Sequence, residues 1–366
     1  MADLKQLLEH GQSIWYDNMR RGMLESGELQ AFFDNGVRGV TSNPTIFDKA
    51  IGQGNDYDEA ISQLAADGKD TNDTYEALVL ADIQRTADML APIYESSKGE
   101  DGYVSLEVSP KLARDTAGTI SEAKRFFAAL DRPNVMIKIP ATPEGIPAIT
   151  EVIGAGINVN VTLMFSLDHY DAVAEAYIKG LEQLAANGGD VSKVASVASF
   201  FVSRVDSAVN KQLDDIGTDD AFALRGKIAI DNAKLAYERF KETFAGERWQ
   251  ALADKGAKVQ RPLWASTGTK DDAYPDTLYV DSLIGPHTVN TVPPHTLDAF
   301  LDHGTVASTL ETDVGGAKTR MAKLADLGVS LDAITEKLQD DGVDSFAKSF
   351  DSLMDSIESK REALVK

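Results

Sequence analysis

A lysine inside an apolar segment is the residue whose type and position most directly suggest chemistry. Lys138 lies in the segment 135–139, and its immediate neighbours are isoleucines. A free lysine has a pKa of about 10.4, so an amine that attacks a carbonyl needs burial or a nearby cation to favour its uncharged form. Lysine amines form Schiff bases with ketoses, and the protonated imine allows the adjacent carbon–carbon bond to break or form. The position of Lys138 therefore indicates Schiff-base chemistry.

Two carboxylates can supply the proton transfers that a Schiff-base cycle needs. Water must add to and leave the carbinolamine, and a sugar hydroxyl must lose a proton during cleavage. Glu107 and Asp17 each lie at the end of an apolar segment, and we expect them at different depths of one pocket. The structural alternative is that Asp17 forms a salt bridge with Lys138 and that Glu107 anchors a helix or loop.

Eight short segments rich in β-forming residues alternate with longer helical stretches. This alternation is typical of β/α units, and eight units predict an α/β fold, a (β/α)₈ TIM barrel with extra helices. No linker or compositional break divides the chain, so we expect residues 1–366 to form a single domain. Helical insertions are expected near 50–100 and 207–256, and a helical tail over 330–366. The predicted strands are 13–17, 39–43, 102–108, 135–139, 158–164, 194–201, 259–266 and 289–292.

Helical periodicity defines the elements between these strands. Apolar residues predict a helix over 75–93 after the capping run 71–74, a second that Ser166 opens and 188–189 closes, and a third around 235–244. The tail from residue 330 predicts two helices with an apolar stripe that includes Phe346. Such a stripe usually packs into the core, and a lid over the barrel mouth is the alternative.

Side-chain alternation within the strands predicts which residues face the barrel interior. Asn158, Asn160 and Thr162 share one face of a strand, and apolar residues share the other. In an exposed antiparallel sheet this pattern would only mean that one face meets water. The helices between the strands favour a barrel instead. We expect the apolar side chains of each strand to pack outward under the helices, and the polar side chains on the other face to point into the barrel.

Polar residues gather at the carboxyl ends of seven of the eight predicted strands. Barrel enzymes place their chemistry at this end, so we expect one site at the barrel mouth. Taken strand by strand, these residues are Asp17; Asn43; Glu107; Lys138; Asn160 and Thr162; Ser199 and Arg204; and Ser266 and Lys270.

Composition excludes several other classes of function. The chain has 36 basic and 58 acidic side chains, a formal charge of −22, which disfavours nucleic acid and anionic membranes as partners. It has no cysteine, so a cytoplasmic protein without disulfides or thiolate sites is expected. The five histidines lack metal-ligand spacing, and we expect no metal. The first residues do not read as a targeting segment, and no apolar run approaches the ~20 residues of a membrane span.

Six motifs along the whole chain closely resemble the transaldolases, in particular their longer bacterial and plant-type branch. This resemblance implies a class I Schiff-base enzyme of the pentose phosphate pathway that needs no cofactor. Such an enzyme transfers a dihydroxyacetone unit from sedoheptulose 7-phosphate or fructose 6-phosphate to glyceraldehyde 3-phosphate or erythrose 4-phosphate. The motifs are TSNPTIF (41–47), SLEVSP (105–110), IKIPATPEGI (137–146), INVNVTLMF (157–165), ASFFVSRVD (198–206) and RPLWASTG (261–268).

The resemblance also implies a role for each matching residue. It implies that Lys138 forms the Schiff base, that Asp17 transfers protons, and that Glu107 and Thr162 bind the reacting water. Asn43, Asn160 and Ser199 fall where relatives hold the dihydroxyacetone hydroxyls, and Phe201 where an aromatic ring lines the pocket.

The phosphate site departs from the pattern of the family's shorter branch. Arg204 matches the phosphate arginine, but a second arginine is absent after Ser266, where Lys270 follows instead. A lysine can act there as a point charge without arginine's two-pronged geometry. Arg204, Lys270, the Ser266 hydroxyl and helix amino termini are expected to attract the phosphate despite the net negative charge.

Three other functions remain open from the sequence. A Schiff-base aldolase would share the lysine but release free dihydroxyacetone, and would form products without an acceptor. A silent sugar-phosphate-binding protein is disfavoured by the intact catalytic set. A transaldolase fused to an isomerase is disfavoured by length. Phosphorylated sugars are the expected partners, and the protein is expected to be a monomer or homodimer.

Overall fold

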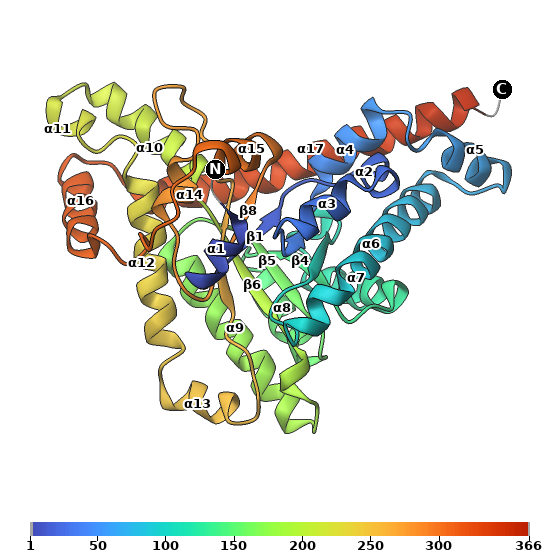
Figure 1. The fold of residues 1–366 in the computed structure, drawn as a ribbon, viewed down its shortest axis with the longest axis horizontal. Coiled ribbons are helices and arrows are strands. Elements are labelled where there is room, and N and C mark those ends of the chain that lie inside the picture. Colours follow the sequence, from blue (N-terminus) through green and yellow to red (C-terminus); the bar gives the residue numbers. More distant parts are fainter. Residues whose placement is uncertain (1–2, 365–366) are drawn as a thin grey trace.

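A closed barrel of eight parallel strands forms the centre of the fold in the computed structural model, which describes residues 3–364 (Figure 1). Each strand pairs with its neighbours in sequence, and β8 pairs with β1. The predicted TIM barrel is confirmed. The strands are β1 Gln12–Tyr16, β2 Gly39–Val40, β3 Tyr103–Glu107, β4 Val135–Pro140, β5 Val159–Met164, β6 Ser196–Phe201, β7 Arg261–Ala265 and β8 Thr288–Val292.

Helices surround this barrel. No helix among residues 3–364 combines the length and apolar character needed to cross a membrane. The helices are α1 Leu4–Glu9, α2 Arg21–Ser26, α3 Glu28–Asp34, α4 Pro44–Gln53, α5 Asp58–Ala66, α6 Thr71–Ser96, α7 Thr116–Leu130, α8 Gly145–Gly154, α9 Leu167–Ala186, α10 Ser203–Ile216, α11 Asp219–Phe222, α12 Ile228–Thr243, α13 Glu247–Ala253, α14 Leu278–Ser282, α15 Pro294–His303, α16 Val314–Asp326 and α17 Leu331–Leu364; short 3₁₀ turns are Pro110–Leu112 and Val191–Lys193.

The strand register brings the predicted polar residues together inside the barrel. Lys138 on β4 is level with Glu107 on β3 and with Asn160 on β5. Asn160 is buried and bonds to side chains of β3 and β6 across the interior. The prediction that the polar side chains of these strands point into the barrel is therefore confirmed. Strand β2 is shorter than predicted because the chain turns away after Val40 and Asn43 caps helix α4 instead.

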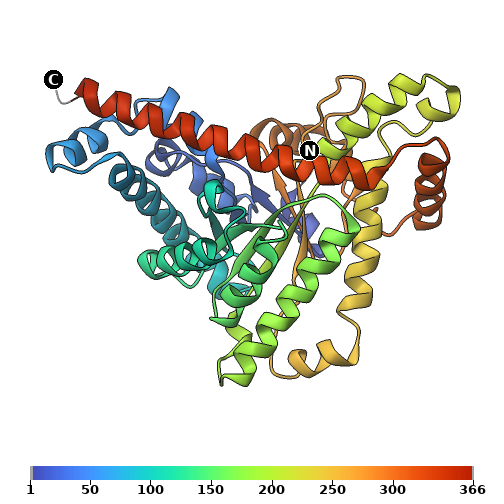
Figure 2. The same ribbon diagram turned by 180° about the vertical axis from the view of Figure 1, so that it is seen from behind.

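Helix α17 corrects the sequence interpretation of the carboxyl-terminal tail. The tail was expected to hold two helices, but residues 331–364 form one helix of 34 residues, about 50 Å long at ~1.5 Å per residue. Residues 365–366 of the predicted tail lie outside the described residues. Figure 2 shows α17, in red, spanning much of the molecule along one end of the barrel. Gln339 fixes this crossing by donating hydrogen bonds to the carbonyls of Ala141 (2.9 Å) and Leu163 (3.0 Å), at the ends of β4 and β5.

A glycine in the middle of α17 allows the helix to approach the barrel closely. A Cβ atom added at Gly342 would lie 2.8 Å from Leu163 Cδ2 and 3.5 Å from Arg204 Nη1. Glycine weakens a helix interior by roughly 1 kcal/mol relative to alanine. The contact with the barrel explains why a residue that disfavours helix is nevertheless suited to this position.

We expect Gly342→Val to destabilise the protein by about 1–3 kcal/mol, because the added methyl groups crowd Leu163. Gly315→Val in α16 is the control, since a Cβ there meets nothing within 4 Å, and its effect should stay within about 0.5 kcal/mol. Chemical denaturation of both variants measures the difference. Equal effects would contradict the close approach of α17.

Candidate active site

A cavity of about 530 Å³ opens at the carboxyl ends of the strands. Glu107 and Asn160 lie behind its wall, bonded or ion-paired to residues that line it. The other predicted site residues line the cavity directly: Asp17, Asn43, Lys138, Thr162, Ser199, Phe201, Arg204, Ser266 and Lys270.

Lys138 is a buried cation with few partners. Its side chain is 7% exposed, and Nζ lies 3.5 Å from Glu107 Oε2 and donates to the carbonyl of Ser42 at 3.2 Å. Arg261, at the opposite end of the barrel, provides a contrast, because its guanidinium bonds to Asp101, Ser13 and the carbonyls of Glu100 and Thr288. The hydrogen-bond donors of Arg261 are therefore largely used by other residues of the protein, whereas the Lys138 amine can still donate hydrogen bonds to a ligand.

The surroundings of Glu107 favour the neutral form of its carboxyl group. Burial raises its pKa to about 7, and the nearby charge of Lys138 opposes that rise. Glu107 also lines a small crevice of about 10 Å³ beside Tyr75 and Phe350, close to the space that one water molecule occupies. The carboxyl group can thus give or take a proton near neutral pH beside a site for water.

Asp17 faces the cavity from the end of β1. Burial raises the pKa of its carboxyl group, and the charge of Lys138 and a hydrogen bond from Thr41 oppose the shift. Thr41 Oγ1 donates to Asp17 Oδ1 at 2.7 Å and lies 2.6 Å from Thr291 Oγ1. Among residues 3–364, the carboxyl group that lies within 4 Å of Lys138 Nζ is that of Glu107, whereas the charge of Lys138 acts on Asp17 without such a close pair.

Asn160 organises hydroxyl groups on the barrel wall. Its amide nitrogen donates to Ser105 Oγ at 3.0 Å, and its amide oxygen accepts from Ser199 Oγ at 2.7 Å. Thr162 Oγ1 differs, because it is buried without a hydrogen-bond partner among the described residues. An unpartnered hydroxyl in a polar cavity is suited to a water molecule or a substrate group.

Arg204 lies between two aromatic rings at the cavity edge. Its Cζ atom is 5.3 Å from the centre of the Phe201 ring and 5.7 Å from that of Phe346. Burial lowers the pKa of Arg204, opposed by the charges of Glu107 and Asp17. No ion pair within 4 Å engages it in residues 3–364. Lys49 and Lys270 line the same cavity, so its mouth is cationic.

Helix amino termini add to this positive character. Helix α4 begins next to Asn43, whose Oδ1 accepts from the Ile46 amide at 3.0 Å, and α15 begins at the lining residue Pro294. Ser266 adopts φ +56, a strained conformation for a residue with a side chain, and its Oγ lies 2.8 Å from Ser203 Oγ at the start of α10. These features favour an anion.

Several cavity residues were missed from the sequence. Thr45, Ile46 and Lys49 share one face of α4, a spacing that the motif around Asn43 could have revealed. His295 follows β8, the one strand to which no site residue was assigned. The centre of the Phe346 ring lies 5.9 Å from Lys138 Nζ; its apolar stripe had indicated core packing, with a lid over the barrel mouth as the alternative, and Phe346 itself was not named as a site residue.

A metal ion is bound by several side chains together, most often those of His, Cys, Asp and Glu. Across residues 3–364, no group of three or more His, Cys, Asp and Glu side chains is arranged to hold a metal ion.

Comparison with known proteins agrees with the geometry. The family model described as "Transaldolase/Fructose-6-phosphate aldolase" matches residues 14–357. The chain is 50% identical to "Transaldolase 1" of Streptomyces avermitilis over 361 residues, covering 98% of this chain and 95% of that protein. It is also 50% identical to "Transaldolase" of Trichodesmium erythraeum over 365 residues, covering 97% and 96%. A third relative, "Transaldolase 2" of Nostoc punctiforme, is 48% identical over 373 residues, covering 99% and 98%.

The predicted family resemblance is thus confirmed by similarity over nearly the entire chain. A closed barrel that carries a buried lysine at its mouth, together with these matches, shows that the chain belongs to the transaldolase/fructose-6-phosphate aldolase family.

Proposed function

We propose that this protein is a transaldolase that moves a dihydroxyacetone unit between phosphorylated sugars through a Schiff base on Lys138. The observation that carries the proposal is the Lys138 amine, 3.5 Å from the Glu107 carboxyl group inside the cavity. The proposed donors are sedoheptulose 7-phosphate and fructose 6-phosphate, and the acceptors are glyceraldehyde 3-phosphate and erythrose 4-phosphate. This exchange belongs to the non-oxidative pentose phosphate pathway.

The first step joins the amine to the ketose. Lys138 Nζ attacks the C2 carbonyl in its uncharged form, and a carbinolamine results. Glu107 then donates a proton to the departing hydroxyl, water leaves, and a protonated imine forms. The free Thr162 hydroxyl and the crevice beside Glu107 are suited to hold that water.

The second step breaks the bond between C3 and C4. Asp17 accepts the proton of the C4 hydroxyl, the C3–C4 electron pair moves toward the imine, and an aldose phosphate leaves. The three-carbon enamine stays on Lys138, where Asn43 and Ser199 can bind its hydroxyls and Asn160 orients Ser199. An acceptor aldehyde enters, the steps reverse, and water releases the new ketose phosphate.

The cationic mouth binds the phosphate groups. Arg204 offers a planar guanidinium held between two rings, and Lys270 and Lys49 offer point charges. Phe346 covers both Lys138 and Arg204. This covering ring favours transfer to an acceptor, because it limits the access of bulk water to the enamine.

Other properties expected from the sequence form part of the same proposal. The chain is proposed to act as a single domain, as a monomer or homodimer, in the cytoplasm and without a cofactor. The absence of cysteine supports that location.

Borohydride added with fructose 6-phosphate should attach the three-carbon unit to Lys138, because reduction traps the imine. Peptide mass spectrometry locates the modified residue, and Lys49 and Lys270 serve as internal controls in the same cavity. Lys138→Met should fold with a normal circular dichroism spectrum and lose at least about 10³-fold in kcat. Labelling of Lys49 or Lys270 instead would refute the assignment.

Sedoheptulose 7-phosphate should be consumed only when glyceraldehyde 3-phosphate is also present. The covered enamine needs an acceptor aldehyde, whereas an aldolase would release free dihydroxyacetone by hydrolysis. Chromatography of both sugars and an enzymatic assay for dihydroxyacetone follow the two outcomes. Steady release of dihydroxyacetone without an acceptor, at a rate like that of transfer, would favour the aldolase alternative.

The pH profile of kcat/KM should contain a limb that falls as pH rises through about 7. Burial raises the Glu107 pKa to about 7, so above that pH the group loses the proton it donates. Glu107→Gln should remove this limb and lower kcat by about 10²–10⁴-fold. Glu122→Gln is the control, since burial also raises the pKa of Glu122 but its partners are Ser109 and Arg125. An unchanged limb in Glu107→Gln would exclude Glu107 as the proton donor.

A further inference from the structure

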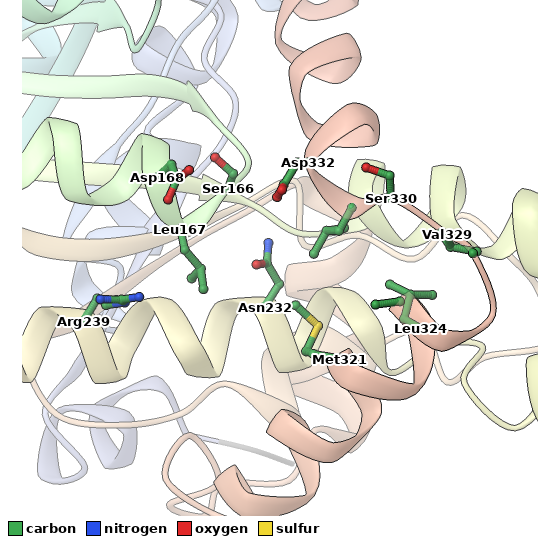
Figure 3. Close-up of a pocket in the computed structure, with 13 residues that line it drawn as sticks. Ser166, Leu167, Asp168, Asn232, Arg239, Met321, Leu324, Val329, Ser330 and Asp332 are labelled. Atoms are coloured by element: carbon green, nitrogen blue, oxygen red, sulfur yellow. The ribbon is translucent and has the colours of Figure 1, made fainter.

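A second cavity, of about 560 Å³, lies outside the barrel where α9, α12 and the junction between α16 and α17 meet (Figure 3). None of its lining residues lines the active-site cavity. It is lined by Ser166, Leu167, Asp168, Asn232, Arg239, Met321, Leu324, Ala325, Gly328, Val329, Ser330, Leu331 and Asp332.

A buried amide oxygen in this cavity lacks a partner. Asn232 is 1% exposed, its Nδ2 donates to the carbonyl of Phe165 at 2.8 Å, and its Oδ1 has no hydrogen-bond partner among the described residues. Because a carbonyl can only accept, the Phe165 contact fixes the orientation of the amide, with nitrogen toward Phe165. A buried oxygen left in this way calls for a hydrogen-bond donor.

Two carboxylates at exposed positions on the rim add negative charge to the cavity. Asp168 and Asp332 have no ion pair or side-chain hydrogen bond with any of residues 3–364. Figure 3 shows Asn232 projecting from α12 between Leu167 and Met321, toward the rim that carries Asp332. The cation of the lining, Arg239, lies 3.9 Å from Asp171 outside the cavity.

The two serines that line the cavity already accept hydrogen bonds from backbone amides of the protein. Ser166 Oγ accepts from the His169 amide at 3.0 Å, and Ser330 Oγ accepts from the Ala333 amide at 3.2 Å. Each serine thus satisfies an amide near the start of its helix. Apart from Arg239, which pairs with Asp171, the polar groups that remain are an amide oxygen and two carboxylates, which all accept hydrogen bonds.

Apolar side chains form the rest of the wall. Leu167, Met321, Leu324, Val329 and Leu331 supply hydrocarbon surface beside the acceptors. A bare metal ion would leave that surface unused, and a phosphate or carboxylate would meet two like charges. A primary ammonium group on a short hydrocarbon chain satisfies both parts of the wall.

We propose that this cavity binds an alkylammonium compound, whose ammonium group lies among Asn232 Oδ1, Asp168 and Asp332 and whose chain lies against Met321 and Leu324. The site does not depend on the transaldolase reaction. Its ligand would touch the starts of α9 and α17 and the Asn232 amide that holds the Phe165 carbonyl.

The test uses n-pentylamine as the probe with the full-length protein in the absence of sugars. In a protein labelled with ¹³C-methyl methionine, the Met321 signal should shift saturably while that of Met23 in α2 stays fixed. Pentanol and pentanoate should fail to reproduce the shift, because neither carries a cationic donor. No saturable shift at Met321, which would mean that water alone fills the cavity, overturns the proposal, as does equal binding of pentanol.

Charge-to-amide variants locate the ammonium group. Asp168→Asn together with Asp332→Asn should weaken pentylamine binding by about tenfold, since each charged hydrogen bond becomes a neutral one. Asp326→Asn is the matched control, an exposed aspartate of α16 outside the lining, and should bind as the wild type does. All three substitutions lie at exposed positions, and the melting temperature checks folding. Undiminished affinity in the double variant would refute the proposed position.

Discussion

The active site depends on keeping an ammonium and two carboxyl groups in the barrel mouth without letting them neutralise one another. Lys138 and Glu107 are both buried, yet their closest approach is 3.5 Å and Glu107 Oε2 accepts no hydrogen bond from any of residues 3–364. A short, fully bonded ion pair would be inert toward a substrate. Burial instead raises the pKa values of Glu107 and Asp17, so protons can move among these groups with little change in the surrounding structure.

The two ends of the barrel differ in whether their buried polar groups have hydrogen-bond partners within the protein. At the amino-terminal end, Arg261 donates hydrogen bonds to Asp101 and to Ser13, and Ser13 in turn donates to Asp101, which satisfies a buried charge. At the other end, groups such as the Thr162 hydroxyl have no hydrogen-bond partner in the part of the chain that the structure describes. The first arrangement stabilises the fold, and the second leaves the site ready for a ligand.

Much of this architecture could be predicted from the sequence because it depends on local patterns. Alternation along single strands placed Lys138, Asn160 and Thr162 inside, and the positions of strand ends gathered Asp17 and Arg204 with them. Residue chemistry alone suggested a Schiff base on Lys138 and proton transfer by Asp17, whereas the roles of Asn160, Thr162 and Arg204 came through family resemblance. The continuity of α17 was not predictable, since Gly342 suits a helix there only because Leu163 lies against it. The position of Phe346 over Lys138 likewise depends on packing between residues far apart in the chain.

The order in which a ribosome makes the chain gives α17 a further importance. All eight strands and Lys138 emerge before the helix that carries Phe346. Until that helix is made, the Phe346 ring that lies beside Lys138 is missing from the barrel mouth. The wall of the cavity is thus completed by the last segment of the chain to be synthesised, and removal of α17 would take that part of the wall away.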